Sequence, residues 1–586
     1  MIKRVWENRG SFDKDEAVRV AREQNITPEF VAILLKRGLS IDSFLHPAKS
    51  VHDSHLLKDM EKGLEIVSKA ISESKKICVV NDYDVDGATS GVIMKECINV
   101  CGGEAFILTP KRNVDGYGMS TRLVNLAKEQ GAELIVTTDN GIAAFEAVSL
   151  AKELGLQVVV TDHHEVPIDS NGNEMLPPAD AIIDPKRKES EYPFRDICGA
   201  EVAYKFAILL FDIFRIDSSK RESYLKRFTE LAAIGTVCDV MPLVEENRAL
   251  VLAGLELLKN SQIVGLRQLM KVQGINPQKL TSYNIGFGIG PCINAMSRIY
   301  DDTETVIALL EEKDHIKAEK LATRLKDANN ERKADSDDGK SRAMSLINES
   351  DNIHIIYIPD SNPAVMGIVA GKVKETTGHP TICLTDAGDG LLKGSGRSTE
   401  NYNMFHYFTL HKDLYEKFGG HEGAIGITFK KDNLEEIKRV INEDAKDLEF
   451  TLRTVVDLYM SMGYVNDAFV TNLSLLEPYG EGNGDVILCD EKCYLLGLSR
   501  MGNSKQYMRL SLRDITGHFR EAVMFSNADM FDELISEKYG EDVLQKLYRK
   551  DTSIVPIELK LLYTPSFNYW GGSRSVSFNV KDFDLG

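Results

Sequence analysis

The feature that most constrains the fold is a repeated alternation of short Val/Ile-rich runs with segments of helical spacing. ICVV at 77–80, AELIV at 132–136 and LQVVV at 156–160 are apolar enough to be strands buried on both faces. Among them lie GVIMKECINV, STRLVNLAKEQ and AAFEAVSLAKEL, which combine helical spacing of apolar residues with good helix formers. Apolar strands that alternate with helices predict a parallel sheet covered by helices on both faces.

Ionisable residues follow these runs at the points where the strands are expected to end. They are Asp82, Asp84 and Asp86 in DYDVDG, Asp139 in TTDNGI, and Asp162, His163 and His164 in TDHHE. The carboxyl ends of parallel strands form the edge at which such sheets bind ligands. We therefore expect these side chains to converge in space although they are far apart in the sequence.

Converging carboxylates and imidazoles indicate divalent cations, because like charges repel unless a cation lies among them. An oxygen-rich set with one or two imidazoles suits Mn²⁺ or Mg²⁺ better than structural zinc. A carboxylate shared by two ions about 3.5–4 Å apart would make a two-metal centre for phosphoryl chemistry. A single aspartate after a strand is more often a helix cap or a turn residue, but clusters at successive strand ends favour the metal site.

The run LAAIGTVCDVMPL adds a further candidate ligand. It is mostly apolar, yet it carries Asp239 directly before Val-Met-Pro. A buried carboxylate is unfavourable unless it is hydrogen-bonded or bound to a metal. Asp239 is therefore the predicted last ligand of the site.

The composition of the chain argues against several classes of protein. A net charge of −19 over 586 residues argues against a surface coated uniformly for nucleic acid, but it leaves room for a local basic groove. The 9 cysteines include no CxxC pair, so a reducing cytoplasm fits better than a disulfide framework or a zinc ribbon. No run of about 18 uncharged apolar residues occurs, so no membrane span is expected, and the polar N-terminus is unlike a signal peptide.

The elements DYDVDG, TTDNGI, TDHHE and IGTVCDVMPL resemble, in order and kind, the four motifs of the DHH phosphoesterase superfamily. Other stretches narrow the resemblance to the RecJ-type single-strand-specific exonucleases: PKRNVDGYG, DICGAEVAYK, GPCINAMSR, GIVAGKV, KGSGRS and FGGHEGAIG. The resemblance covers nearly the whole chain. The ordered set of motifs is far more specific than a DHH triplet alone.

The resemblance implies two ligand sets: Asp84 and Asp139 for one metal ion, and Asp86, Asp139, His163 and Asp239 for the other. Asp82 lies beside them and either ligates or orients. Some members of the superfamily carry a histidine at the position of Val80, so the ligand set of the first ion stays open. By the same resemblance, His164 would face the scissile phosphate and Asp162 would orient the imidazoles.

The resemblance also implies a set of substrate-binding residues: Arg112, Arg298, Ser395, Arg397, Gly419, Gly420 and His421. Arg112, Ser395 and Arg397 would bind a 5′-terminal phosphate, since a guanidinium fork and a hydroxyl suit that group. We expect the glycine-rich stretches to project from loops of a second small α/β domain. Cys292 and Asn362 stand where the family usually has Arg and His, which would weaken a substrate contact at position 292.

From about Thr471 the chain becomes β-rich, with five alternating runs that predict a small closed barrel. Four aromatic residues of this part either stack on bases or serve as core and cross-strand partners, with equal support for each. They are Tyr507, Phe567, Tyr569 and Trp570.

The expected architecture is multidomain α/β, with a parallel-sheet DHH domain, a long bridging helix, a smaller α/β DHHA1 domain and a C-terminal barrel of oligonucleotide-binding type. The predicted bounds are 1–50 for an N-terminal segment, 51–300 for the DHH domain, 301–345 for the bridging helix, 346–450 for the DHHA1 domain, and 451–586 for a connecting helix and the barrel.

The function implied is that of a Mn²⁺- or Mg²⁺-dependent exonuclease that degrades single-stranded DNA from the 5′ end to mononucleotides, in repair and recombination. The expected partners are single-stranded DNA and, as candidates, a single-strand-binding protein or a helicase, with no membrane and a monomeric state. One alternative is a DHH enzyme for small substrates, which generally lacks a terminal barrel. The other is a catalytically inactive DNA-binding scaffold, which the retained ligand set disfavours.

Overall fold

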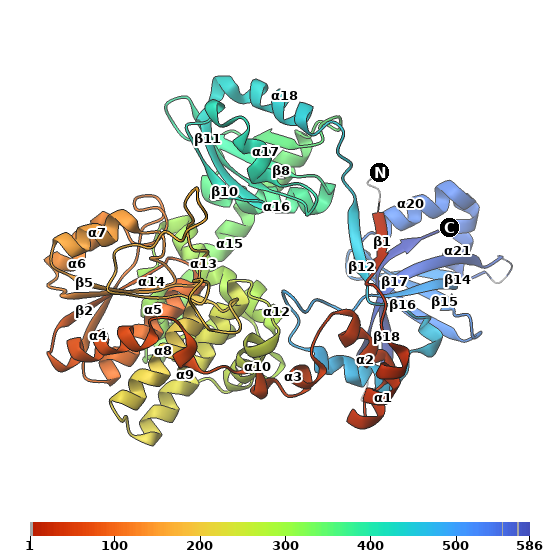
Figure 1. Cartoon of the computed structure of the whole chain (residues 1–586). Coiled ribbons are helices and arrows are strands. Elements are labelled where there is room, and N and C mark those ends of the chain that lie inside the picture. The colour runs from red at the N-terminus through yellow and green to blue at the C-terminus, as the bar shows by residue number, and fades with distance from the viewer. Residues whose placement is uncertain (1–3, 552, 554, 571–572, 586) are drawn as a thin grey trace. The chain divides into compact units, whose positions relative to one another are not determined.

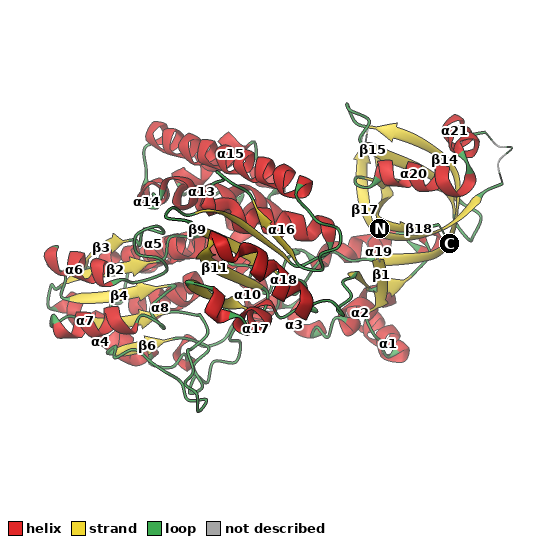
Figure 2. Cartoon of the chain, turned by 90° about the horizontal axis from the view of Figure 1, so that it is seen from above, coloured by secondary structure: helices red, strands yellow, loops and turns green. Residues whose placement is uncertain are grey.

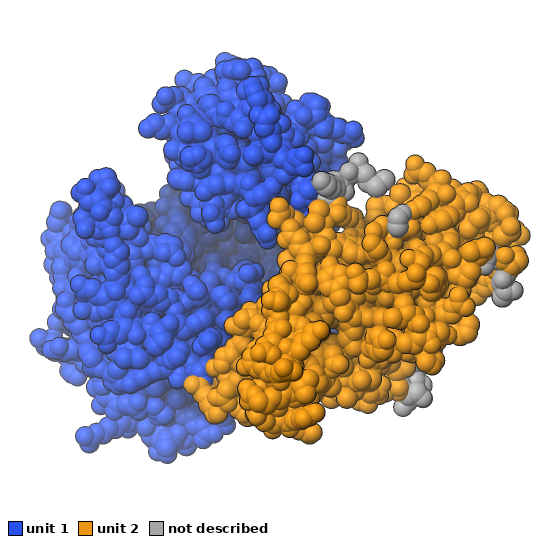
Figure 3. Space-filling view, turned by 45° about the vertical axis from the view of Figure 1, so that its right-hand side comes forward, with its two compact units in different colours: residues 1–3, 50–452, 480–482 blue, residues 4–49, 453–479, 483–586 orange. Residues whose placement is uncertain are grey.

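The computed structural model describes residues 4–551, 553, 555–570 and 573–585, and the side chains of Tyr569, Trp570 and Ser573 fall outside the described part. The chain divides into two compact units (Figure 3). Unit 1 contains residues 50–452 and 480–482, and unit 2 contains residues 4–49, 453–479 and 483–586. Each unit is described by itself.

Unit 1 begins with the predicted parallel sheet. Its five strands have the order β3-β2-β4-β5-β6, and every neighbouring pair is parallel. They are β2 (Lys76–Asn81), β3 (Glu104–Leu108), β4 (Leu134–Thr138), β5 (Gln157–Thr161) and β6 (Ala181–Ile183). The three apolar runs form β2, β4 and β5, which lie side by side in the sheet, and the predicted parallel sheet is confirmed.

Helices cover both faces of this sheet, because successive strand residues point to opposite sides. Ile77 and Val79 belong to one hydrophobic core, whereas Cys78 and Val80 belong to another. The first core is shared with α4 (Met60–Ser72), α5 (Val85–Val100) and α8 (Gly199–Ile213), and the second with α6 (Thr121–Glu129) and α7 (Phe145–Glu153). Figure 2 shows the strands in yellow among these helices in red.

A helical part follows the sheet and extends the first core. It comprises α9 (Ser218–Cys238), α10 (Glu245–Leu258), α11 (Val264–Gln273), α13 (Gly290–Tyr300), α14 (Glu304–Glu311) and α15 (His315–Ser345). The bridging helix predicted over 301–345 is in fact two helices. The carboxylate of Asp314 accepts the N–H groups of Ile316 and Lys317, and this N-cap begins α15 there.

The second sheet of unit 1 is mixed and has the order β10-β11-β9-β8-β7. Its strands are β7 (His354–Tyr357), β8 (Thr381–Asp386), β9 (Leu391–Arg397), β10 (Lys417–His421) and β11 (Ala424–Lys430), with the helices α16 (Met366–Thr377), α17 (Met404–Thr409) and α18 (Leu434–Asp444). The α/β character predicted for this part of the chain is confirmed.

Unit 2 contains the predicted barrel. The strand order β13-β14-β15-β16-β18-β17 closes on itself, because β14 also pairs with β17. The strands are β13 (Leu458–Tyr459), β14 (Leu488–Met501), β15 (Tyr507–Arg513), β16 (Phe519–Met524), β17 (Ile557–Trp570) and β18 (Ser573–Asp584). Two helices connect β16 to β17 and were not predicted from the sequence. They are α20 (Ala528–Tyr539) and α21 (Glu541–Arg549).

The N-terminal residues belong to the same unit as the barrel. Phe30 and Ile33 of α2 (Pro28–Lys36) are fully buried in the core that the barrel strands form. Arg37 reaches Asp457 with two guanidinium nitrogens, at 3.0 and 2.9 Å. The five-part division of the chain given above stays a prediction. Among the residues that the structure describes, no helix combines the length and apolarity that a membrane crossing requires.

Candidate active site

The first cluster of aspartates lies where β2 passes into α5 (Figure 1). Asp84 is the N-cap of α5, and its Oδ1 accepts the N–H of Gly87 at 3.0 Å. A Cβ on Gly87 would lie 2.4 Å from the carbonyl oxygen of Asp82, so only glycine permits this tight turn. The helix-cap interpretation of an aspartate is therefore correct for Asp84. Capping occupies one carboxylate oxygen and leaves the other available.

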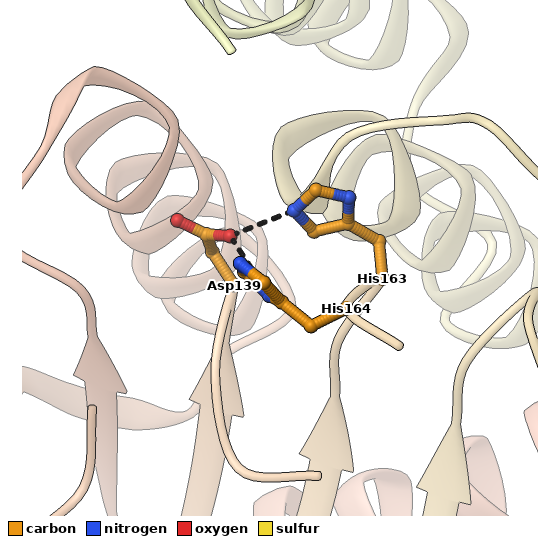
Figure 4. Close-up of side chains that lie close together, drawn as sticks. All are labelled: Asp139, His163 and His164. Atoms are coloured by element: carbon orange, nitrogen blue, oxygen red, sulfur yellow. Dashed lines mark hydrogen bonds and ion pairs between the residues drawn. The ribbon is translucent and has the colours of Figure 1, made fainter. Parts of the chain in front are cut away.

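Asp139 and the two histidines follow the neighbouring strands β4 and β5 (Figure 4). The Nε2 atom of His163 lies 3.0 Å from Oδ1 of Asp139, and Nδ1 of His164 lies 3.9 Å from the same oxygen. Asp139 has a φ of 61°, which is unusual for a residue other than glycine. A strained backbone at a strand end is typical of functional sites.

Asp239, at the end of α9, completes the cluster. His163 Nε2 lies 3.5 Å from Oδ2 of Asp239 and 3.7 Å from Oδ2 of Asp86. The structure thus brings all the predicted metal ligands together in three overlapping groups: Asp139, His163 and His164; Asp86, His163 and Asp239; Asp82, Asp84 and Asp139. Within each group the ligand atoms lie within 4.8 Å of one another.

Backbone amides hold one of these carboxylates in place. Asp86 is buried, and its two oxygens accept the N–H groups of Gly199 at 2.6 Å and Ala200 at 2.9 Å, at the start of α8. A Cβ on Gly199 would lie 2.6 Å from the Cβ of Asp139. The glycine lets the positive end of the helix approach both carboxylates.

The electrostatics of the cluster are unfavourable without a cation. Burial and the neighbouring Asp86, Asp84 and Asp239 raise the pKa of Asp139 well above its usual range. Burial and the charges of Asp86 and Asp84 raise the pKa of Asp239 to about 8, and burial lowers the pKa of His163 to about 4. Within the described part of the chain, Asp82 Oδ2 is buried without a hydrogen-bond partner. A divalent cation would satisfy this oxygen and remove the repulsion, so the residues fit the metal.

Asp162 and His164 form a hydrogen-bonded pair at the margin of the cluster, where His164 also lies near Asp139. Asp162 Oδ1 lies 2.8 Å from His164 Nδ1, and Asp162 Oδ2 accepts the N–H of Ile142 at 2.9 Å. Although burial disfavours the charge, the hydrogen bond and the charge of Asp162 raise the pKa of His164 to about 9. The hydroxyl of Tyr117 lies 2.8 Å from the other ring nitrogen, Nε2. His164 is therefore an oriented cation at neutral pH.

Four guanidinium groups lie close to one another, and the charge of one of them, Arg112, opposes the rise that burial causes in the pKa of the nearby Asp82 carboxyl. Burial and the charges of Arg112, Arg332 and Arg397 lower the pKa of Arg298 to about 10. The four guanidinium groups contact neutral partners. Arg112 lies over the ring of Tyr83, 4.1 Å from its centroid, and Arg298 donates a hydrogen bond to Ala364 O. Arg332 donates to Asn329 Oδ1, and Arg397 donates to Gly396 O. Such a concentration of like charge suits a phosphate-bearing ligand.

The glycine-rich stretches do not project from loops, and this expectation is wrong. Ser395 and Arg397 lie in β9, and Gly419, Gly420 and His421 lie in β10, the edge strand of the second sheet. Glycine is compatible with a strand here because the backbones approach closely. A Cβ on Gly420 would lie 2.2 Å from the carbonyl oxygen of Ala424. A substrate-binding role for these residues stays a prediction.

Two residues with functional contacts are missing from the predicted set. Tyr117 lies in PKRNVDGYG, but its contact with His164 depends on the fold of the loop. Arg332 is a candidate for the substrate face from its sequence, but it lies in a charged helix whose pattern favours a solvated surface, so it is not in the predicted set. Cys292, where the family usually has Arg, is buried, and its sulfur accepts from Asn329 Nδ2 at 3.4 Å.

Comparisons with known proteins agree with this arrangement. The family described as "DHH family, N-terminal domain" matches residues 76–236, "DHHA1 domain" matches 350–447 and "RecJ OB domain" matches 456–582. The single-stranded-DNA-specific exonuclease RecJ of Haemophilus influenzae is 31% identical over 91% of this chain and 92% of its own length. The chain belongs to the RecJ family. RecJ of Bacillus subtilis is 30% identical over 89% of this chain. The matched region covers 66% of the length of that relative.

Solved structures of the RecJ family bear out the fold. RecJ of Thermus thermophilus in complex with Mn²⁺ superposes with a TM-score of 0.81 at 23% identity, covering 99% of this chain and 80% of that one. An exonuclease RecJ bound to manganese superposes with a TM-score of 0.58 at 27% identity, and the match covers 67% of this chain and 95% of that one. The predicted fold class and family are confirmed.

Proposed function

We propose that the chain is a divalent-metal-dependent exonuclease that hydrolyses single-stranded DNA from the 5′ end to mononucleotides and acts in DNA repair and recombination. The observation that carries the proposal is the convergence of the carboxylates on His163 at the carboxyl ends of β2, β4 and β5. The relatives named as single-stranded-DNA-specific exonucleases support the substrate class.

The residues that would hold the metals are Asp82, Asp84, Asp86, Asp139, His163 and Asp239. Asp139 groups with Asp82 and Asp84, and its Oδ1 lies 3.0 Å from Nε2 of His163, which groups with Asp86 and Asp239. This position between the two sets supports its role as the ligand shared by both ions. When bound, Mn²⁺ or Mg²⁺ would polarise the phosphodiester and activate water. The relatives solved with Mn²⁺ and with Mg²⁺ support either ion.

His164 and Asp162 would serve the reaction without binding metal. The carboxylate of Asp162 fixes the ring of His164 and stabilises its charge. The protonated ring can then donate a hydrogen bond from Nε2 to a phosphate oxygen as negative charge develops there. For that contact the Tyr117 hydroxyl would have to give up its place at Nε2.

The 5′-to-3′ direction of digestion would follow from recognition of the 5′ end by the arginines. Arg112, Ser395 and Arg397 would bind the terminal 5′-phosphate, and Arg298 would lie beside them. Gly419, Gly420 and His421 would line the same substrate surface from β10. A phosphate held at a fixed distance from the metals would place the first phosphodiester at the reacting position, so that mononucleotides leave.

The second unit would bind the strand before it reaches the metals. A closed barrel that matches the RecJ OB domain supports this role and speaks against an enzyme for small substrates. We extend the proposal to a cytoplasmic monomer, to a single-strand-binding protein or a helicase as partner, and to the domain bounds 1–50, 51–300, 301–345, 346–450 and 451–586.

The test uses the purified protein with Mn²⁺ on 5′- and 3′-labelled single strands, on a blunt duplex and on a short RNA. We expect mononucleotides to be released from the 5′ end of the single strand, little cleavage of the duplex, and no activity after chelation. Release from the 3′ end, or cleavage that survives chelation, would contradict the proposal.

A further inference from the structure

Two exposed aromatic rings form a stacked pair on unit 1. The rings of Tyr283 and Phe287 have centroids 4.7 Å apart and an interplanar angle of 27°. Tyr283 is 68% exposed and Phe287 is 66% exposed. Isolated apolar residues at a surface need no explanation, but two large rings stacked and presented together form a patch that suits a flat ligand.

The backbone beneath the pair is irregular but firmly anchored. Tyr283 lies in α12 (Ser282–Asn284), and Phe287 lies in a π-helical turn, η4 (Ile285–Ile289), that leads into α13. Ile285 and Ile289 are fully buried on the opposite side of that turn. Single π-helical turns occur frequently at functional sites. Buried anchors beneath exposed rings hold the rings in place before any ligand arrives.

This turn packs directly against the end of α9, which carries a predicted metal ligand. The sulfur of Cys238 lies 4.0 Å from the carbonyl oxygen of Ile285, and a Cβ on Gly290 would lie 2.5 Å from the same sulfur. Asp239 is the next residue of the chain. The aromatic pair and the metal cluster are therefore carried by two segments in contact with each other.

The residue after Asp239 adds a second, independent observation. Val240 has a φ of 58° and is 61% exposed. A β-branched residue with positive φ is a strained outlier, and glycine would relieve the strain at such a helix end. Backbone strain of this kind clusters at functional sites, which supports a functional role for the surface at this end of α9.

We propose that Tyr283 and Phe287, together with Val240, form a stacking surface for nucleobases of the DNA strand whose phosphodiester lies at the metal cluster. The inference rests on the proposed function. The metal ions held by the carboxylates, and the guanidinium groups, would bind phosphates, whereas this neutral apolar surface would contact the flat faces of bases. Stacking on aromatic rings tolerates every base, which suits an enzyme that degrades any sequence.

The test is a double-mutant cycle between the protein and the strand. A 5′-phosphorylated single strand receives one abasic position, moved along its first few nucleotides. For the unmodified protein we expect kcat/KM to fall about five- to a hundredfold where the missing base is one that stacks. For Tyr283→Ala and Phe287→Ala we expect kcat/KM on the intact strand to fall by the same factor. The abasic position should then cause no additional decrease in kcat/KM. Tyr283→Phe keeps the ring and is expected to behave like the unmodified protein.

The control is Ile316→Ala, which removes a large apolar side chain that is equally exposed, at 68%, on α15. A second readout does not need cleavage: 2-aminopurine in a bound strand should be quenched by the unmodified protein and less so by the two alanine variants. Alanine variants that keep the full abasic effect and the full quenching would overturn the inference. So would variants that only change the oligomeric state in light scattering, since the rings would then contact another protein chain.

The two proposals fail differently. If the unmodified protein cleaves no single strand, the proposed function is wrong, and the quenching experiment still decides whether the rings bind bases. If cleavage proceeds from the 5′ end but neither readout responds to the aromatic variants, the function stands and the stacking surface is wrong.

Discussion

Unit 1 holds two clusters of like charge, one acidic and one basic, and they are built differently. The acidic cluster lies at the ends of neighbouring parallel strands, where the sheet topology forces residues from separate motifs together. The basic cluster draws Arg112 from a loop, Arg298 and Arg332 from two helices, and Arg397 from a strand of the second sheet. A ligand of the opposite charge would relieve the repulsion within each cluster. The first suits metal ions and the second suits phosphate.

The largest effect is expected from removing the shared ligand. Asp139→Ala should reduce Mn²⁺-dependent cleavage to the background, because its carboxylate lies between the two ligand sets and is the proposed ligand of both ions. Initial rates on a labelled single strand at saturating Mn²⁺ measure the loss. The variant should keep its fold in circular dichroism and bind strands through the basic cluster. Cleavage within about tenfold of the unmodified protein would contradict the role of Asp139 as the shared ligand.

The next prediction concerns the repulsion within the acidic cluster. Mn²⁺ should raise the free energy of unfolding of the unmodified protein by about 2.7 kcal/mol for each bound ion at one hundred times its Kd. Asp139→Asn should make the metal-free protein more stable, because it removes one of several like charges, and should abolish the gain from Mn²⁺. Thermal unfolding with and without chelator measures both. A gain from Mn²⁺ that survives the substitution would show that the ion binds elsewhere.

A third prediction distinguishes the basic cluster from the acidic one. Arg397→Ala should reduce the preference for 5′-phosphorylated over 5′-hydroxyl strands about ten- to a hundredfold, since a charged hydrogen bond contributes roughly 1.5–3 kcal/mol. The measurement is the ratio of initial rates on the two substrates. Mn²⁺ binding should be unchanged. A matched control is Arg439→Ala, whose guanidinium pairs with Glu436 on an exposed helix face and which should leave the ratio as it is.

The smallest effect is expected from the barrel of unit 2. Tyr507, at the start of β15, packs edge-to-face on Phe525, which is 56% exposed. Tyr507→Ala should raise KM for long strands about fivefold, because stacking on one base is worth about 1 kcal/mol or more. It should leave the hydrolysis of a very short oligonucleotide unchanged. Equal losses on both substrates would assign Tyr507 to the barrel's stability instead. Of the other aromatic candidates, Tyr569 and Trp570 have side chains outside the described part of the chain.

The acidic cluster could be predicted from local sequence patterns, whereas three arginines of the basic cluster, Arg112, Arg298 and Arg397, could be predicted only through the family resemblance, for a physical reason. Strands and their ends are visible as apolar runs followed by polar residues, so Asp82, Asp139 and Asp162 fall where expected, directly after β2, β4 and β5. The arginines meet through packing between distant elements, which no local pattern reveals. The same limit explains why residues 4–49 fall in one unit with the barrel and why Tyr117 and Arg332 are missing from the predicted set.

The central claim is that the acidic cluster binds two divalent ions through a shared carboxylate. Counting Mn²⁺ per chain after equilibrium dialysis, for the unmodified protein and for Asp139→Ala, tests it most directly. Because Asp139 is proposed to ligate both ions, we expect two ions per unmodified chain and the loss of both in the variant. One ion per chain, or two that remain bound after Asp139→Ala, would contradict the account.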